Sequence, residues 1–284
     1  MGILFGLISA LGSSFQNTFF KSEGLKAENP FLLNWYRLLG GLPVMALLVT
    51  LFAEWKIPEP RFWLILLGLS LPVELALSYL YVRAFQSSPQ SLVGPLFSLS
   101  ALFLIPLGYV FLGELPSTLG AIGILSVMIG PFFLGKESQG KFGSMKNLLR
   151  EKGTWYMLAS AFLAASGVTI TKFSFQYASP LLFTFYSLVL LLLAITIILW
   201  FQRGFSHLPY DRSFLGMILA YVAVVATHAV GLSLIFAAYF ISLKRLSIVF
   251  DVFLGRLVHK EGHFRERLTG ALFMVAGVLL IAFG

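Results

Sequence analysis

Eight side chains have the types and positions that could bind a charged substrate or a proton. They are ionisable or carry a hydroxyl, and all lie within long apolar stretches. An ionisable group at the centre of a bilayer costs on the order of 3 kcal/mol, so it needs a partner or a water-filled cavity. The candidate residues for substrate binding or ion coupling are therefore Arg37, Glu74, Ser78, His228, Lys244, Arg245, Ser247 and Asp251.

The spacing of these residues places several of them on common helix faces. Glu74 and Ser78 are four residues apart, and Lys244 is followed by Ser247 and Asp251 at intervals of three and four. Side chains three or four residues apart share one face of an α-helix. A face that meets lipid has no use for such groups, so we expect both faces to point toward a central cavity.

The charges suggest a division of roles. Arg37, Lys244 and Arg245 would attract a carboxylate or another anionic group, and Glu74 or Asp251 would bind an amine or a coupling proton. Each residue also has a structural interpretation.

Arg37 and Glu74 fall at similar depth, so they could form an ion pair that only holds two helices together. Arg245 points about 100° away from the face of Lys244. A histidine such as His228 is more often a packing residue than a proton relay.

The composition is that of a membrane protein. Of 284 residues, 58% are hydrophobic and 11% charged, and the mean hydropathy is +0.89. A helix needs about 20 apolar residues to cross a bilayer. This predicts an all-α integral membrane fold with ten transmembrane helices at 3–20, 30–53, 61–83, 89–112, 117–135, 153–172, 179–201, 213–234, 236–258 and 267–283.

Charge and cysteine content exclude several functions. The formal charge of +8 is spread over short connections and forms no basic domain, so we expect no nucleic-acid partner. The absence of cysteine excludes disulfides, thiol catalysis and Cys-ligated metals. We expect neither a metal nor a cofactor, and the partners predicted are a small-molecule substrate and the lipid bilayer.

An internal repeat divides the chain. PFLLNWYRL at 30–38 aligns without gaps to PLLFTFYSL at 180–188, and a Glu–Gly–Gly set at 114, 123 and 130 recurs with the same spacing at 261, 270 and 277. Five helices in each half give the halves opposite orientations in the membrane. The predicted units are two inverted five-helix repeats, 1–135 and 153–284, joined by a polar loop at 136–152.

The repeat also places the two adjacent cations. Its register sets 241–252 opposite 94–105, a stretch that lies inside the fourth helix. Lys244 and Arg245 then fall about two turns into the ninth helix. The alternative, in which they occupy a loop, leaves too few apolar residues for the helix to span.

The sequence resembles the drug/metabolite transporter superfamily, of the EamA type. The resemblance rests on FLGELPSTLGAIGILSVMIG at 111–130, on its counterpart VHKEGHFRERLTGALFMVAGVLLI at 258–281, and on Arg37 in the second helix. It implies a ten-helix carrier of small organic molecules and says little about which one.

The function expected is a secondary transporter that moves a small metabolite by alternating access, with proton coupling left open. A lipid-linked head-group flippase of the same fold is the main alternative. An intramembrane enzyme is less favoured. HKEGH at 259–263 has Lys260 at the position where the HExxH helix of a zinc protease has its glutamate. We therefore expect the chain not to be an enzyme.

The expected location is the plasma (inner) membrane, with both termini on the same side. Lysine and arginine concentrate in the connections opposite the termini, which places the termini outside. The resemblance implies the reverse. Paired glycines in the fifth and tenth helices permit close helix approach, either within one chain or in a homodimer through these two helices.

Overall fold

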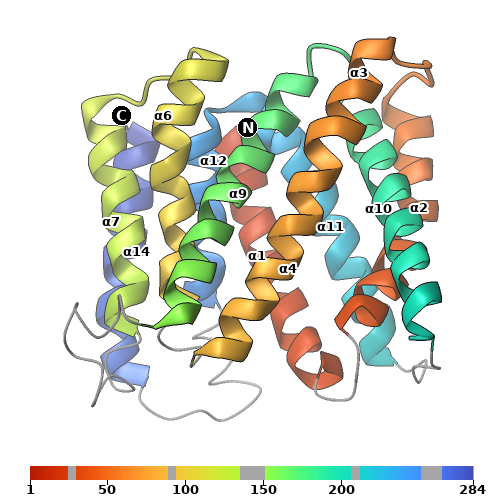
Figure 1. Cartoon of the computed structure of the whole chain (residues 1–284). Helices are drawn as coiled ribbons and strands as arrows, with labels where there is room; N and C mark the ends of the chain where they lie inside the picture. The colour runs from red at the N-terminus through yellow and green to blue at the C-terminus, as the bar shows by residue number, and fades with distance from the viewer. Residues whose placement is uncertain (25–29, 89–93, 135–150, 206–211, 251–263, 284) are drawn as a thin grey trace.

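The computed structural model describes residues 1–24, 30–88, 94–134, 151–205, 212–250 and 264–283 (Figure 1). This part contains ten continuous helices and no strands, which confirms the all-α class; residues 60–87 and 94–112 are each one helix that changes type along its length. In chain order the elements are α1 (Gly2–Gly24), α2 (Pro30–Phe52), α3 (Pro60–Ile65), η1 (Leu66–Ser70), α4 (Leu71–Ser87), η2 (Gly94–Leu99), α6 (Ser100–Leu112), α7 (Thr118–Leu134), α9 (Lys152–Ser174), α10 (Pro180–Gln202), α11 (Arg212–Leu234), α12 (Ala237–Lys244) and α14 (Phe264–Phe283).

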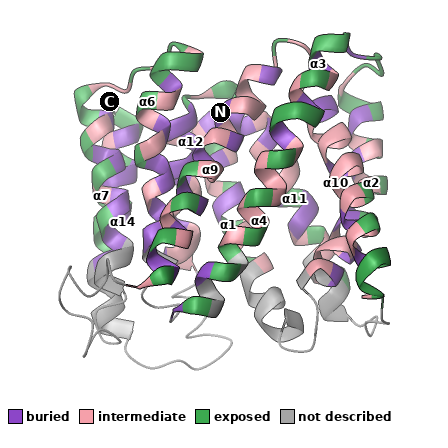
Figure 2. Ribbon diagram, in the orientation of Figure 1, coloured by how far each residue is buried: buried purple, intermediate pink, exposed green. Residues whose placement is uncertain are grey.

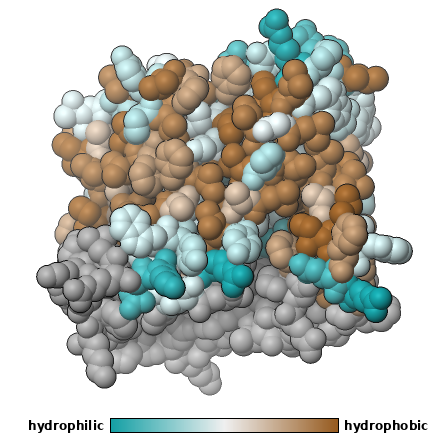
Figure 3. Space-filling view, viewed as in Figure 1, coloured by the Kyte–Doolittle hydropathy of each residue, from teal (hydrophilic) through white to brown (hydrophobic). Residues whose placement is uncertain are grey.

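The apolar helices agree with the predicted membrane fold. Four described segments are long and apolar enough to cross a bilayer, and shorter apolar helices lie at the other predicted positions except 236–258. Side chains exposed on the outer surface of the bundle include many large apolar residues, as expected where a protein meets lipid (Figure 2). On the visible face these residues form an apolar band, with hydrophilic residues toward both ends (Figure 3). The four long segments are Asn34–Phe52, Pro60–Tyr81, Lys152–Ser174 and Pro180–Gln202.

Proline and glycine set several helix ends. Pro180 begins α10, where its missing N–H costs nothing, and the Ser179 hydroxyl accepts a hydrogen bond from the Leu182 N–H at 3.3 Å. Gly113 ends α6 with a φ of 68°, a left-handed conformation that glycine adopts without strain.

The third span is interrupted by a π-helical turn. Its α3 and α4 segments are joined by η1, a π-helix of five residues that ends just before Pro72. Proline has no N–H to donate, and its ring crowds the carbonyl four residues earlier, here that of Gly68. The wider π turn relieves this conflict, and such turns are frequent at functional sites. Glu74 follows two residues after Pro72, so the irregular turn sets the direction of its side chain.

The ninth span is interrupted as well. α12 ends at Lys244, Arg245 and Leu246 form a turn, and residues 247–250 are helical again. The predicted remainder of this span, 251–258, lies outside the described residues. Lys244 is thus about two turns into the helix, as predicted, and Arg245 stands at a break that the sequence did not predict.

Irregular segments of the fourth and ninth spans correspond in the predicted repeat. The register that sets 94–105 opposite 241–252 places η2, a 3₁₀ segment at Gly94–Leu99, opposite 241–246. The described α-helix begins at Ser100 in the fourth span and resumes at Ser247 in the ninth.

Two of the main helix–helix contacts map onto each other when the two halves of the chain are exchanged. α1 packs on α11 and α4 packs on α9, which are equivalent pairs when helices one to five are exchanged with six to ten. α7 packs on α14 at one edge of the bundle, and α2 packs on α10 at the other (Figure 1). In the same view α1 and α9 run in opposite directions. These features support the predicted inverted repeat, which stays a prediction.

Glycines bring α7 and α14 into direct backbone contact. A Cβ added at Gly123 would lie 2.6 Å from the Gly277 carbonyl oxygen, and one added at Gly277 would lie 2.6 Å from that of Gly123. Gly130 likewise faces the Gly270 carbonyl oxygen, at 2.7 Å from such a Cβ. These glycines therefore serve packing within one chain. A homodimer through the fifth and tenth helices stays a prediction.

Candidate substrate site

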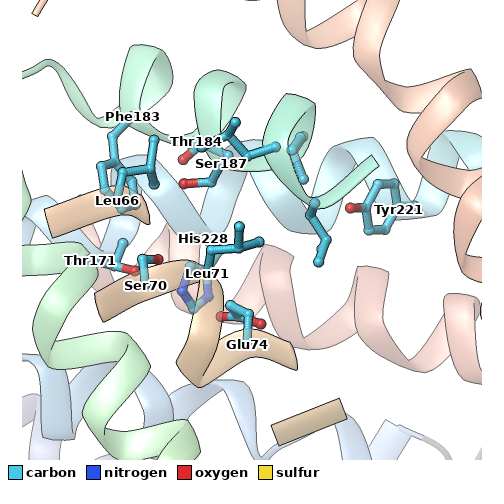
Figure 4. Close-up of a pocket in the computed structure, with 13 residues that line it drawn as sticks. Leu66, Ser70, Leu71, Glu74, Thr171, Phe183, Thr184, Ser187, Tyr221 and His228 are labelled. Atoms are coloured by element: carbon cyan, nitrogen blue, oxygen red, sulfur yellow. The ribbon is translucent and has the colours of Figure 1, made fainter. Parts of the chain in front are cut away.

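A cavity of about 210 Å³ lies between the two halves (Figure 4). Its walls come from the third span of the first half and from three helices of the second, and they mix apolar side chains with hydroxyl, carboxylate, phenol and imidazole groups. The lining residues are Leu66, Ser70, Leu71, Glu74, Thr171, Phe183, Thr184, Ser187, Leu188, Leu190, Leu191, Tyr221 and His228.

Glu74 places a carboxylate in this cavity. One of its oxygens lies 3.5 Å from the position that a Cβ of Gly167 would take. The carboxylate therefore packs against α9 at a glycine. Glu74 interacts electrostatically with Lys244 and with Tyr221. The charge is thus set against groups of the opposite half, as predicted for a cavity-facing residue.

His228 and Lys244 form a second polar group. The Lys244 Nζ lies 3.4 Å from Nδ1 of His228, whose ring lines the cavity. The other side of that ring packs edge-on against Phe240, with the ring centres 5.1 Å apart. His228 therefore stands between the Lys244 ammonium and the cavity. Its two predicted roles, packing and proton relay, are both compatible with this position.

Arg37 lies behind one wall of the cavity. Its guanidinium carbon is 5.0 Å from the centre of the Tyr221 ring, and one of its nitrogens donates to the Asn34 side-chain oxygen at 2.7 Å. Tyr221 interacts electrostatically with both Arg37 and Glu74. The tyrosine thus connects the two residues that were predicted to pair, and a direct Arg37–Glu74 ion pair stays a prediction.

Arg245 turns away from the cavity, toward the first half. Its guanidinium donates to the Ser100 hydroxyl at 2.7 Å and lies 4.6 Å from the centre of the Phe97 ring. Ser100 is the first residue of α6 and is 1% exposed. Arg245 therefore joins the break in the ninth span to the end of η2 in the fourth.

Of the predicted residues, Glu74 and His228 are in the cavity wall as described, whereas Arg37, Lys244, Arg245, Ser78 and Ser247 are not. Ser78 is half-buried one turn beyond Glu74, and Ser247 is half-buried at the start of the resumed helix. Asp251 lies outside the described residues. Whether these three contribute to the site stays a prediction.

The structure adds polar residues that sequence reasoning did not select. Thr184, Ser187 and Tyr221 line the cavity from α10 and α11. The Ser187 hydroxyl is buried and has no hydrogen-bond partner among the described residues. Thr184 and Ser187 are three residues apart on one helix face, within the segment that revealed the repeat, and that spacing was the available signal.

The described residues contain no group of three or more His, Cys, Asp or Glu side chains that could hold a metal ion. What the cavity offers is hydrogen-bonding groups and the Glu74 carboxylate, with Lys244 behind His228 and Arg37 behind Tyr221. Such groups can hold a polar solute or a proton inside a membrane.

Comparison with known proteins agrees with this architecture. A solved structure titled "Crystal structure of protein" superimposes with a TM-score of 0.77 at 17% identity, covering 99% of this chain and 98% of the other. This likeness concerns the fold alone. No curated protein matches the sequence.

The apolar helices are those of a multi-pass integral membrane protein. Residues 1–135 match the model of the EamA-like transporter family, which is part of the drug/metabolite transporter superfamily and indicates a membrane transporter. The resemblance inferred from the sequence motifs is thereby confirmed.

Proposed function

We propose that this protein is a secondary transporter that carries a small organic metabolite by alternating access. The observation that supports this most directly is the cavity, which takes walls from both halves and holds ionisable groups inside an apolar bundle. Transporters with repeated halves bind their substrate near the midplane between the repeats, in helices that are broken there. The π turn in the third span, the 3₁₀ segment at the start of the described fourth span and the turn in the ninth span fit this arrangement.

The cavity volume favours a small substrate. At about 210 Å³ it is smaller than the roughly 300–1,000 Å³ of pockets that hold drug-sized ligands. A solute the size of an amino acid, a small organic acid or an amine matches this space. A lipid-linked sugar head group needs more room, so the flippase alternative receives less support.

The charges favour a substrate that carries an anionic group. Lys244 and His228 would receive that group at one side of the cavity, with Arg37 adding positive charge behind Tyr221. Glu74 would bind an amine of the same molecule or a coupling proton. A protonated Glu74 is neutral and needs no cation beside it. The carboxylate can therefore be neutralised either by the amine of the substrate or by a proton.

Arg245 has a different role in this proposal. Its contacts with Ser100 and Phe97 make it a brace that holds the break of the ninth span, and Lys244 alone of the two cations lies on the cavity side, where it acts on the substrate through His228. We place no catalytic step in the cavity. Transport requires only binding and release from either side.

Ligand-induced thermal stabilisation of the purified protein tests this function. Amino acids, amines, organic acids, sugars and nucleosides are screened at pH 5.5 and pH 7.5. A ligand that binds only the folded state at 100 times its Kd stabilises it by about 2.7 kcal/mol. We expect a hit among compounds with a carboxylate or another anionic group.

Variants decide whether the cavity is the site. Glu74→Gln and Lys244→Met should each abolish the stabilisation. Glu54→Gln, which alters an exposed ion pair in a connection, should leave it intact. A hit that survives both cavity variants rules out this site. Stabilisation only by lipid-linked compounds would favour the flippase.

A further inference from the structure

A second charged cluster joins the two halves at the end of the bundle where α1 begins (Figure 1). Glu114, in the connection after α6, forms an ion pair with Lys172 near the end of α9. The two side chains are only 11% and 15% exposed. The pair is therefore largely withdrawn from water, unlike an ordinary surface salt bridge.

The same carboxylate also holds the start of α12. Its second oxygen accepts a hydrogen bond from the Ala237 N–H, the first residue of that helix, at 2.7 Å. Lys172 in turn donates to the Ile235 carbonyl oxygen. Glu114 of the first half is thus bound to two segments of the second half, and it meets the positive end of a helix dipole.

A tyrosine reinforces this junction two residues further along α12. The Ser117 N–H donates to the Tyr239 hydroxyl at 3.0 Å. Gly120 leaves space for this hydroxyl, because a Cβ there would lie 1.9 Å from its oxygen. The connection from α6 to α7 therefore contacts the first turn of α12 at two residues, Ala237 and Tyr239.

The cluster lies directly beyond the cavity. Thr171, the neighbour of Lys172, is part of the cavity wall. At the same end, Phe183 of the wall packs against Phe62, with ring centres 5.8 Å apart, and against Phe175 at 6.0 Å. Phe62 belongs to the first half and the other two rings to the second. The cavity is thus bounded at this end by contacts that cross between the halves.

We infer that the Glu114–Lys172 pair is a latch that closes the cavity toward this end and breaks when the cavity opens there. The inference rests on the proposed alternating access. A withdrawn ion pair is weak as a source of stability, because desolvation offsets much of its attraction. It is well suited to a reversible contact, because the separated charges regain water when the end opens.

α12 connects the latch to the substrate groups. Its first residue, Ala237, is held by Glu114, and its last, Lys244, contacts His228 at the cavity. The helix has eight residues, so the two points are about 12 Å apart along one rigid element. A substrate that draws Lys244 into the cavity would shift α12 and strain the latch, which couples occupancy to opening.

Cysteine accessibility tests the latch without any knowledge of the substrate. The chain contains no cysteine, so Ser187→Cys places one thiol in the cavity wall. A membrane-impermeant maleimide is added to either face of sealed proteoliposomes. Glu54→Cys, in the exposed connection before α3, identifies the face that carries the latch. We expect slow labelling of the cavity thiol from that face.

Adding Glu114→Gln to Ser187→Cys should raise labelling from the latch face about tenfold, equivalent to about 1.4 kcal/mol in favour of the open form. Lys172→Gln should act in the same way. The double variant Glu114→Lys and Lys172→Glu exchanges the two charges and should slow the labelling of the cavity thiol again, in part. Glu54→Gln, which removes an exposed pair at the same end, should change nothing.

Unchanged labelling in a folded Glu114→Gln protein overturns the latch. If that variant does not fold, Lys172→Gln and the charge exchange decide the question by the same criterion. The readout is independent of ligand binding. A failed latch therefore leaves the proposed function standing, and a failed ligand screen leaves the labelling result standing.

Discussion

Lys244 and Arg245 are adjacent in the chain, yet their side chains serve different halves of the bundle. The Lys244 ammonium lies 3.4 Å from His228 at the cavity, whereas the Arg245 guanidinium donates to Ser100 of the first half. Arg245 keeps helical backbone angles, with φ −65° and ψ −15°, so the divergence follows from the rotation of about 100° between successive helical residues.

The first prediction separates these two roles. Ser100→Ala removes the acceptor of a buried charged donor and should lower the free energy of unfolding by about 1–3 kcal/mol. Lys244→Met should abolish ligand binding with a smaller loss of stability, because Glu74 can take up a proton once the cation is gone. Thermal unfolding in detergent and the ligand screen measure the two effects. Equal losses of binding and stability in both variants would contradict the separation.

The second prediction concerns the contact between α7 and α14. A methyl group added by Gly123→Ala would meet the Gly277 carbonyl oxygen at 2.6 Å, and such overpacking costs about 1–3 kcal/mol. Gly68→Ala is the matched control, because nothing lies within 4 Å of its added Cβ. That change should be neutral or gain up to about 1 kcal/mol. A Gly123→Ala protein as stable as the parent would mean that the two helices separate readily.

The third prediction concerns Ser187, whose buried hydroxyl has no partner among the described residues. A hydroxyl left unsatisfied costs free energy, so Ser187→Ala should leave the empty protein at least as stable as the parent. If the substrate hydrogen-bonds to this group, its affinity should fall by about 0.5–1.5 kcal/mol. Calorimetric titration with the compound found in the screen measures this. An unchanged affinity would remove Ser187 from the site.

The fourth prediction concerns Pro72 and the π turn before it. Pro72→Ala restores an N–H and removes the clash with the Gly68 carbonyl, so an unbroken α-helix becomes available to this span. The variant should still fold. Its Glu74 side chain should rotate away from the cavity, and ligand binding should weaken at least about tenfold. Val73→Ala serves as a neighbouring control. Full binding by Pro72→Ala would show that the π turn does not position the carboxylate.

The fifth prediction concerns the orientation of the protein in its membrane, which we propose is the plasma (inner) membrane. The connection carrying Glu54 lies at the same end as the start of α1 (Figure 1). The bias of lysine and arginine toward the opposite connections places this end outside the cytoplasm. An impermeant reagent should therefore label Glu54→Cys from outside intact cells. Labelling only after the cells are opened would support the orientation that the family resemblance implied.

Much of the fold was predictable because the sequence marks it physically. Long apolar runs locate the helices, and residues such as Pro60 and Pro180 mark where they begin. The break after Lys244 was not predictable, because neither proline nor glycine stands at Arg245 or Leu246. That turn depends on tertiary contacts, above all the hydrogen bond from Arg245 to the other half.

Of the candidate site, the charged residues were the part that the sequence could predict well. Glu74 and Lys244 stand out because an ion inside a bilayer is costly. Hydroxyl groups carry no such signal, because in a helix they can bond to the carbonyl four residues earlier, as Ser160 does with Tyr156 at 2.8 Å. For Ser187, which lines the cavity, the available signal is the helix face that it shares with Thr184.

The π turn at Leu66–Ser70 also bears on the ancestry of this span. A helix that gains one residue can keep its packing on both sides by absorbing the extra residue as a π turn. A homologous chain that is one residue shorter at this point could therefore form a continuous α-helix. Its residue equivalent to Glu74 would be rotated by about 100° around the helix axis. A single codon gained or lost here would thus be enough to bring a carboxylate into the cavity or to take it out.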